Sequence, residues 1–272
     1  MRVEKLRRAA IAGWLVCPCL APCLAVAAAA TTDDRIALSA DGSTLTGTNG
    51  GGGASATWLH NFDADTIAGL AVEHQVIATA HWTFGSLSGS MTRGAGDARY
   101  SLYGEAHEGS GDDGPNSFHY SVAAAGVIGT YFHQLSVQLE DRQIDIEATH
   151  GNLPKVGLSY LWTPHLLTSV SYAYSVSGNL GTHLASVRID KYGAVNLLAG
   201  VSFGQASPEV FNLAIVLPGK TLREGYVGFS KPLPNLRSEL TVVADYLDLS
   251  GSKKATLTLS YIFHVGRAGT AR

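Results

Sequence analysis

The sequence predicts an all-β protein folded as an antiparallel transmembrane β-barrel, and two observations lead to this fold class. From Val156 to Tyr174, apolar residues alternate with small polar ones on both sides of a Thr163-Pro164 turn. A period of two predicts β-strands, because successive side chains lie on opposite faces of the pleat. The pattern recurs to the end of the chain, with tyrosine and tryptophan on its apolar side. A membrane barrel turns apolar and aromatic side chains toward lipid and polar ones toward its interior.

The composition agrees with a sheet protein and excludes several classes. Of the 272 residues only 15% are charged, and 31 are glycine, which suits a sheet better than a helical bundle. With a formal net charge of −3 the chain has no excess of basic residues, so nucleic acid is not an expected partner. After residue 30 no stretch offers about 20 consecutive apolar residues, so the sequence predicts no transmembrane helix.

The first thirty residues (1–30) read as a signal peptide and not as part of the fold. Basic residues at positions 2, 5, 7 and 8 precede the apolar segment Ile11–Leu24, and Ala28-Ala29-Ala30 satisfies the small-x-small cleavage rule. We expect cleavage after Ala30 and a mature chain that begins at Thr31. The alternative is an uncleaved membrane anchor, which the prolines and the alanine-rich end of the segment disfavour.

All three cysteines, Cys17, Cys19 and Cys23, lie in this leader. The expected mature chain therefore has no disulfide and no thiol chemistry, which suits transit through an oxidising periplasm. A lipoprotein is an alternative that would use Cys23, but Pro22 departs from the small residue usually found before such a cysteine.

Sixteen strand-like segments follow the leader with hardly any helical interruption, and turn-forming sequences such as Pro218-Gly219 separate them. An even strand number with both termini in the periplasm is typical of bacterial barrels. Because the chain is short for sixteen strands, fourteen and twelve remain alternatives. The expected strands are Arg35–Thr46, Gly53–Phe62, Asp65–His74, Thr79–Met91, Ala98–Glu108, Ser117–Ile128, Tyr131–Glu140, Gln143–His150, Lys155–Trp162, Leu167–Ser177, His183–Asp190, Ala194–Gly204, Glu209–Leu217, Arg223–Ser230, Leu236–Leu247 and Lys253–Phe263.

The chain shows no internal linker, so we expect one barrel over residues 31–263 and a short tail over residues 264–272. The most loop-like piece is Gly109–Asn116, which is acidic and has no large apolar residue. The segment Thr48–Gly53 is predicted to be a second flexible tip.

A soluble periplasmic β-protein that binds a ligand would show the same alternation, with its apolar face buried as a core. Two features favour the membrane. The face opposite Leu240 and Val242 carries Arg237, Glu239 and Asp245, which a filled core would resist. Aromatic residues near strand ends are typical of an interfacial girdle. The residues expected in that girdle are Tyr160, Trp162, Trp82, Tyr226, Tyr246 and Tyr261.

The last strand resembles the C-terminal assembly signal of outer-membrane proteins, which alternates apolar residues and ends on an aromatic one. The matching residues are Leu257, Leu259, Tyr261 and Phe263. The chain continues to Arg272, whereas the usual signal stops at the aromatic residue. The match implies insertion by the barrel assembly machinery into the lipid of a Gram-negative outer membrane.

Four short motifs within Gly157–Phe263 carry a further resemblance, and they are Gly200–Gly204, Gly225–Gly228, Ala244–Tyr246 and Leu257–Phe263. Together they resemble the YaiO-type family of small outer-membrane barrels. This resemblance implies an outer-membrane barrel, sometimes associated with exopolysaccharide export, and it carries over no catalytic residue.

The search for an active site assigns no catalytic residue. His107 lies close to Glu105 and Glu108, where carboxylates could orient an imidazole as a base, but no serine in a nucleophile context accompanies it. The other histidines lack the spacing of a metal site, and the glycines at 50–53 lack the Lys-Ser/Thr of a phosphate loop. We expect no enzyme, metal or cofactor; the alternative is a barrel enzyme that acts on outer-membrane lipid.

Charged residues expected at the interior or its rim are the remaining site candidates. A mixed set of charges would give a pore of weak ion preference, whereas a closed ion-pair network would brace a plug. We therefore predict a Gram-negative outer-membrane barrel without enzymatic activity, either a channel or an accessory of envelope or exopolysaccharide transport, with a small solute or a polysaccharide as its partner. The expected lumen charges are Glu73, Glu105, Glu147, Arg188, Asp190, Arg223, Arg237, Glu239 and Asp245.

Overall fold

The computed structural model describes residues 34–47, 50–77, 80–95, 98–113, 116–146, 149–178, 180–206, 220–249 and 252–266. These ranges form fifteen strands and one 3-10 turn, η3 (Pro234–Leu236). The strands are β1 (Asp34–Leu45), β2 (Gly51–Asn61), β3 (Thr66–Ile77), β4 (Ala80–Ala95), β5 (Ala98–Asp113), β6 (Asn116–Tyr131), β7 (Leu135–Ile146), β8 (Thr149–Asn152), β9 (Lys155–Thr163), β10 (Leu166–Tyr174), β11 (His183–Lys191), β12 (Asn196–Ala206), β13 (Lys220–Leu233), β14 (Ser238–Leu249) and β15 (Ser252–Val265).

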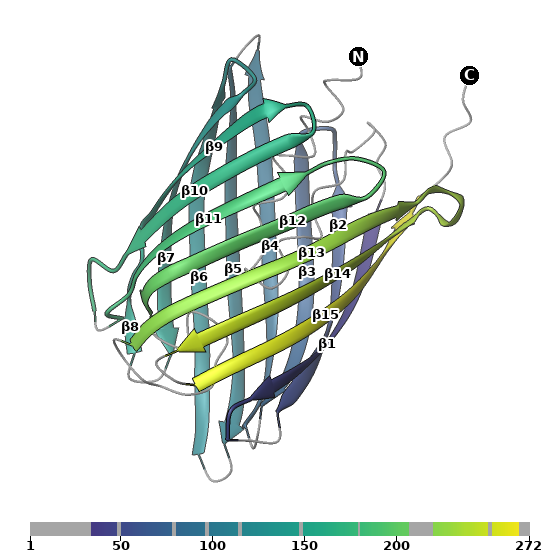
Figure 1. Ribbon diagram of the computed structural model, residues 1–272. Helices are drawn as coiled ribbons and strands as arrows, with labels where there is room; N and C mark the ends of the chain where they lie inside the picture. Colours follow the sequence, from purple (N-terminus) through teal and green to yellow (C-terminus); the bar gives the residue numbers. More distant parts are fainter. Residues whose placement is uncertain are drawn as a thin grey trace.

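The strands form one antiparallel sheet that closes on itself as a barrel (Figure 1). Strands that follow one another along the chain are neighbours, and β1 pairs with β15 to close the ring. Strands β8 and β9 pair with β7 in one register, in which Gln143 faces Asn152 and Glu140 faces Lys155. They therefore act as one interrupted wall strand, and the barrel has fourteen.

The count of fourteen corrects the expected sixteen and matches the first alternative. Two expected strands, Tyr131–Glu140 and Gln143–His150, fall largely on β7, whose ladder with β6 continues through Asp141 and Arg142. A charged pair in the middle of a strand is compatible with the pleat, because Asp141 points outward and is exposed while Arg142 points inward. The expected strand Glu209–Leu217 lies outside the described residues.

The acidic segment Gly109–Asn116 is mostly strand, which corrects the expected loop. Strand β5 continues to Asp113, and β6 begins at Asn116. Gly109 and Gly111 are closely packed strand residues, because a Cβ on Gly109 would overlap Thr83 and Phe84 of β4, and one on Gly111 would overlap β4 and the Phe118 ring of β6. The expected tip Thr48–Gly53 also differs in part, since β2 begins at residue 51; Thr48 and Asn49 lie outside the described residues.

The wall has an apolar outward face and a polar inward face, as the alternation predicts. On β15, Leu257 and Leu259 are 58% and 51% exposed on the outward face, while Ser260 is buried on the inward one. Other outward apolar residues that are exposed include Leu38, Leu70, Val72, Leu87, Leu102, Leu139, Val156, Leu158, Val170, Ile189, Leu197, Val201 and Val227. Among the residues that the structure describes, no helix has the length and apolar character needed to cross a membrane.

The expected aromatic girdle is correct in part. Outward aromatic residues include Tyr160, Trp162, Tyr246 and Tyr261. Trp82 and Tyr226 face inward instead: Trp82 is 7% exposed, and Tyr226 pairs with Gly200 on one side and Asp245 on the other. A shift of one residue in the assumed phase of a strand moves every side chain to the other face, and this shift explains the two errors.

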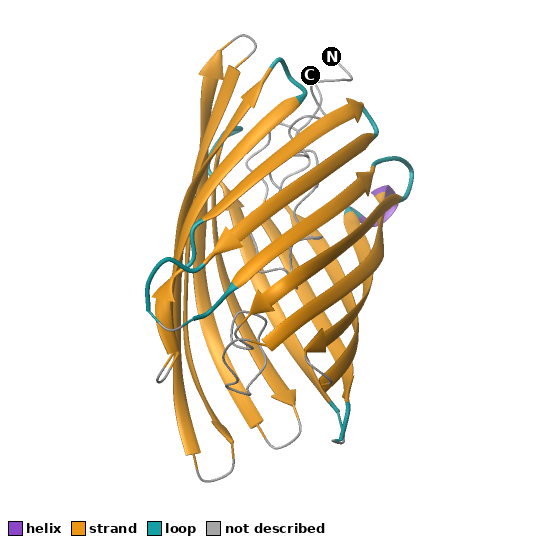
Figure 2. Cartoon of the chain, turned by 60° about the vertical axis from the view of Figure 1, so that its left-hand side comes forward, coloured by secondary structure: helices purple, strands orange, loops and turns teal. Residues whose placement is uncertain are grey.

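The two ends of the barrel differ. At the end that we call the termini end, β1 begins and β15 finishes, with Asp34 opposite Val265. The opposite end, here the far end, holds the β5–β6 turn and the connection between β10 and β11. Figure 2 shows described loops at both ends of the barrel. The expected leader, 1–30, and most of the expected tail lie outside the described residues, and β15 runs two residues past Phe263.

Candidate functional site: the inward face of the barrel

Six of the nine charged residues expected at the lumen lie on the inward face, and they are Glu73, Glu105, Arg188, Asp190, Glu239 and Asp245. Arg223 points outward near the far end, beside Phe203 in register. Arg237 follows η3 in the β13–β14 turn, and its guanidinium donates a hydrogen bond to the carbonyl oxygen of Gly266. Glu147 lies outside the described residues.

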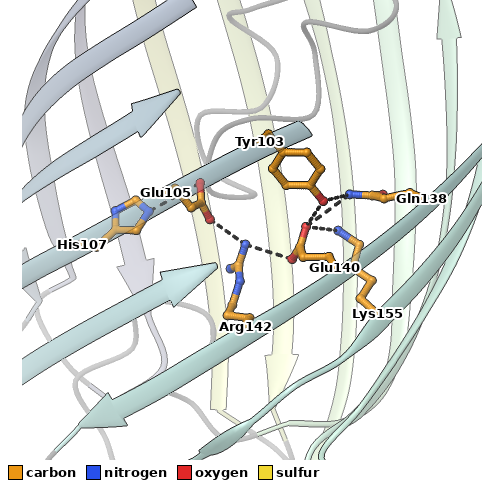
Figure 3. Close-up of polar contacts among 7 residues, drawn as sticks. All are labelled: Tyr103, Glu105, His107, Gln138, Glu140, Arg142 and Lys155. Carbon is orange, nitrogen blue, oxygen red and sulfur yellow. Dashed lines mark hydrogen bonds and ion pairs between the residues drawn. The ribbon is translucent and has the colours of Figure 1, made fainter. Parts of the chain in front are cut away.

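The most extensive group of inward polar contacts links β5, β7 and β9 (Figure 3). Arg142 on β7 donates to Glu105 on β5 (Nη2 to Oε1, 2.8 Å) and also lies 3.4 Å from the nearer carboxylate oxygen of Glu140. Lys155 on β9 approaches the other oxygen of Glu140 at 3.6 Å. His107 lies 3.6 Å from Glu105, so the sequence-predicted pair is the edge of a larger network.

Tyr103 and Gln138 complete this network. The Tyr103 hydroxyl donates to the carboxylate of Glu140 at 2.7 Å and accepts from the Gln138 amide at 2.6 Å. Glu140 and Gln138 are 8% and 3% exposed. Glu140 thus has partners on three strands, and Glu105 is paired with Arg142 of β7. Such pairing is the condition under which a buried charge is tolerated.

Small residues on β6 make this geometry reachable. Tyr103 and Glu140 belong to strands that flank β6, and Gly126 lies between them in register. A Cβ on Gly126 would overlap the Tyr103 ring, so only glycine lets the ring cross the middle strand. We call such a contact, made over a glycine of the intervening strand, a glycine bridge. Glycine inside a strand often marks such a close approach.

A second glycine bridge lies on the wall formed by β11, β12 and β13. Tyr226 crosses Gly200 and reaches Arg188, with which it hydrogen-bonds. Arg188 also makes a bidentate pair with Asp190 on its own strand, through Nε at 2.9 Å and Nη2 at 2.6 Å. This pair stays within one strand, whereas the Glu140 network joins three.

The third wall, β1 to β3, uses a glutamine in the same way. The Gln75 amide crosses Gly53 and donates to Asp41 at 2.9 Å and to Glu73 at 2.8 Å. On β13 and β14, Glu224 and Asp245 lie within hydrogen-bonding distance of each other. Near the termini end, Ser230 donates to Glu239, and Arg35 donates to Asn61 at 3.3 Å.

Sequence reasoning missed the residues that organise the interior: Tyr103, Gln138, Glu140, Arg142 and Lys155. Two signals point to them. They alternate in step with the other inward residues of their strands. In addition, the strand that separates two of their strands has a glycine in its interior. The second signal becomes readable only when the pairing register is known. Within the described ranges, no group of three or more potential metal ligands occurs.

No protein-family model matches the chain, and no curated protein matches it. Solved structures similar in fold include the CymD monoaromatic hydrocarbon channel, at 11% identity and a TM-score of 0.57, covering 87% of this chain and 90% of that one. The Pseudomonas putida toluene transporter TodX has 10% identity and a TM-score of 0.52, covering 86% and 90%. A Pseudomonas aeruginosa FadL homologue has 6% identity and a TM-score of 0.52, covering 85% and 90%. The chain therefore has the fold of these barrels.

Proposed function

We propose that the protein is an outer-membrane channel for a small solute and catalyses no reaction. The observation that carries this proposal is the contrast between the two faces of a closed barrel. The outward face exposes Leu257, Leu259 and Val227 in a continuous apolar band, and a large exposed apolar surface marks contact with a partner or a membrane. The inward face carries paired charges and hydroxyl groups, as in aqueous barrels.

The arrangement of the inward charges supports a channel over an enzyme. Glu105 and Glu140 are held by Arg142, and Asp190 is held by Arg188. Carboxylates engaged in this way brace the wall and have little capacity to accept a proton from a substrate. The similar folds of CymD, a monoaromatic hydrocarbon channel, and TodX, a toluene transporter, support the same proposal and suggest a small organic molecule as cargo.

The targeting expectations belong to this proposal. A signal peptide over residues 1–30 would direct the chain across the inner membrane, and the alternation that ends at Phe263 would present the last strand to the assembly machinery. The partners would then be outer-membrane lipid and that machinery. The YaiO-type resemblance, with its link to exopolysaccharide export, stays a prediction.

Flux into liposomes tests the proposal. Purified protein would be reconstituted, and the passage of potassium ions, a small sugar and toluene would be compared with protein-free liposomes of the same lipid. We expect the protein to accelerate at least one of the three. A reconstituted, folded barrel that accelerates none of them would contradict the channel. Recovery of the protein from the soluble periplasm without detergent would contradict the membrane location.

A further inference from the structure

Near the far end the inward face carries buried apolar side chains beside charged ones, such as Glu73 opposite Phe84 and Glu224 opposite Leu247. One buried cluster gathers residues of β1, β4, β13 and β14. Its members are Leu45, Ala80, Trp82, Phe84, Leu222 and Leu247, with Phe118 and Leu184 packed against it. Leu222 is completely buried, and Leu247 is 4% exposed.

A second buried cluster continues this layer on the other side of the barrel. Its members are Val122, Ile144, Leu153, Ala173 and Leu180, with Tyr120 packed against it. Leu180 comes from the connection between β10 and β11 and is completely buried, so this connection adds an apolar side chain to the wall.

One glycine bridge joins the two clusters, and a second lies within the first cluster. Phe84 and Tyr120 stand on either side of Gly109, and their ring centroids are 5.9 Å apart. Trp82 and Phe118 flank Gly111 in the same way, with centroids 6.5 Å apart.

On the opposite side Leu184 and Leu222 flank Gly204, and Leu184 pairs in register with Ala173 of the second cluster. The two clusters therefore meet at both sides and form an apolar ring around the inner wall. Lys254, which lies in register between Leu45 and Leu247, interacts electrostatically with Glu73 and Asp245.

The chemistry of this ring decides what it can pass. An apolar constriction in a channel gates by expelling water, and an ion that enters it loses hydration. The charged groups beside the ring, Lys254, Glu73 and Asp245, interact with one another. An aromatic molecule gains contacts there, because Trp82, Phe84, Phe118 and Tyr120 present ring faces and edges at the spacing that aromatic pairs favour.

We propose that this apolar ring is the selective element of the barrel: it binds small monocyclic aromatic molecules and blocks hydrated ions. The proposal rests on the proposed channel function and names its substrate class. The ring, and not the charged network at Glu140, then determines which solutes pass, and the network serves to brace the wall.

Ion conductance in planar bilayers tests the blocking role. The ring variant Leu222→Ser with Leu247→Ser would be compared with the control Leu167→Ser with Leu198→Ser, whose two leucines are also inward and buried but lie nearer the termini end. We expect no stepwise current from the wild type or the control, and stepwise single-channel currents from the ring variant. A wild type that conducts potassium ions as well as the folded ring variant would overturn the inference while leaving a channel.

Fluorescence quenching of Trp82 tests the binding role without relying on the serine variants. Replacing the outward Trp58 and Trp162 by Phe leaves Trp82 as the single tryptophan after residue 30. We expect nitrobenzene to quench Trp82 in a saturable manner, and glucose at equal concentration to leave it unchanged. Linear, unsaturable quenching would refute binding at the ring. If neither the wild type nor the folded ring variant passes ions, sugar or toluene, the channel function fails as well.

Discussion

Two of the glycine bridges are made by tyrosines, Tyr103 and Tyr226, and they differ in the group that the tyrosine contacts on the other side of the glycine. Tyr103 crosses Gly126 to a carboxylate, Glu140, that Arg142 and Lys155 also approach from two strands. Tyr226 crosses Gly200 to a guanidinium, Arg188, that is already paired with an acidic residue two positions along its own strand. The first bridge is part of a network that ties three strands together, whereas the second adds one contact to a pair that is complete without it.

This difference shows how a glycine in a strand can be either essential or supplementary to the wall. Both glycines leave room for a tyrosine ring. Only the tyrosine that crosses Gly126 hydrogen-bonds to a buried carboxylate, and that carboxylate has partners on several strands. A buried charge that loses a partner costs far more than a neutral group that loses a hydrogen bond. We therefore expect the wall around Tyr103 to respond more strongly to mutation than the wall around Tyr226.

The largest effect is expected from Arg142→Met. This change leaves both Glu105 and Glu140 without their shared cation, and breaking a buried pair in this way costs about 3–5 kcal/mol. Arg188→Met removes the partner of Asp190 alone, so its cost should be smaller. Urea unfolding of the folded barrel in detergent micelles would measure both. Equal free energies of unfolding for the two variants would show that the networks do not differ.

A smaller effect is expected from Gly126→Ala, whose new methyl group meets the Tyr103 ring and, slightly farther away, the Leu139 carbonyl oxygen. Overpacking of this kind costs about 1–3 kcal/mol. Gly225→Ala is the matched control, because the nearest atoms to a Cβ there lie 4.0 Å away, and such a change alters stability by no more than about 0.5 kcal/mol.

A double variant sharpens this second comparison. If the methyl group acts through the ring, Gly126→Ala should cost much less when Tyr103 is already Ala, so the two changes should be non-additive. The same cycle with Gly200→Ala and Tyr226→Ala should give a smaller coupling. Additive effects in both cycles would argue against the glycine bridges.

The sequence predicts the faces of the strands better than their number or their contacts. Leu257, Leu259 and Asp245 lie on the expected faces because a period of two is a local property of the chain. Strand number failed at β7, where Asp141 and Arg142 resemble a turn although each finds a suitable face. The predicted face of Trp82 is wrong, because alternation alone does not distinguish an inward tryptophan from an outward one in the aromatic girdle.

The interior contacts could not be predicted because they depend on register. Tyr103 and Glu140 are 37 positions apart, and nothing local states that Gly126 lies between them. The glycines of β5 resemble a loop in the sequence for the same reason, since their role becomes visible only beside Phe84 and Phe118. Pairing across strands is the information that the chain does not display locally.

Site-directed spin labelling of β15 tests most directly whether the apolar face of the barrel contacts lipid. The expected mature chain has no cysteine, so single cysteines at Leu257, Thr258, Leu259 and Ser260 can each carry one label in reconstituted membranes. We expect high accessibility to oxygen at 257 and 259 and low accessibility at 258 and 260, with a period of two. Equal oxygen accessibility at all four positions, or an alternation of opposite phase, would contradict it.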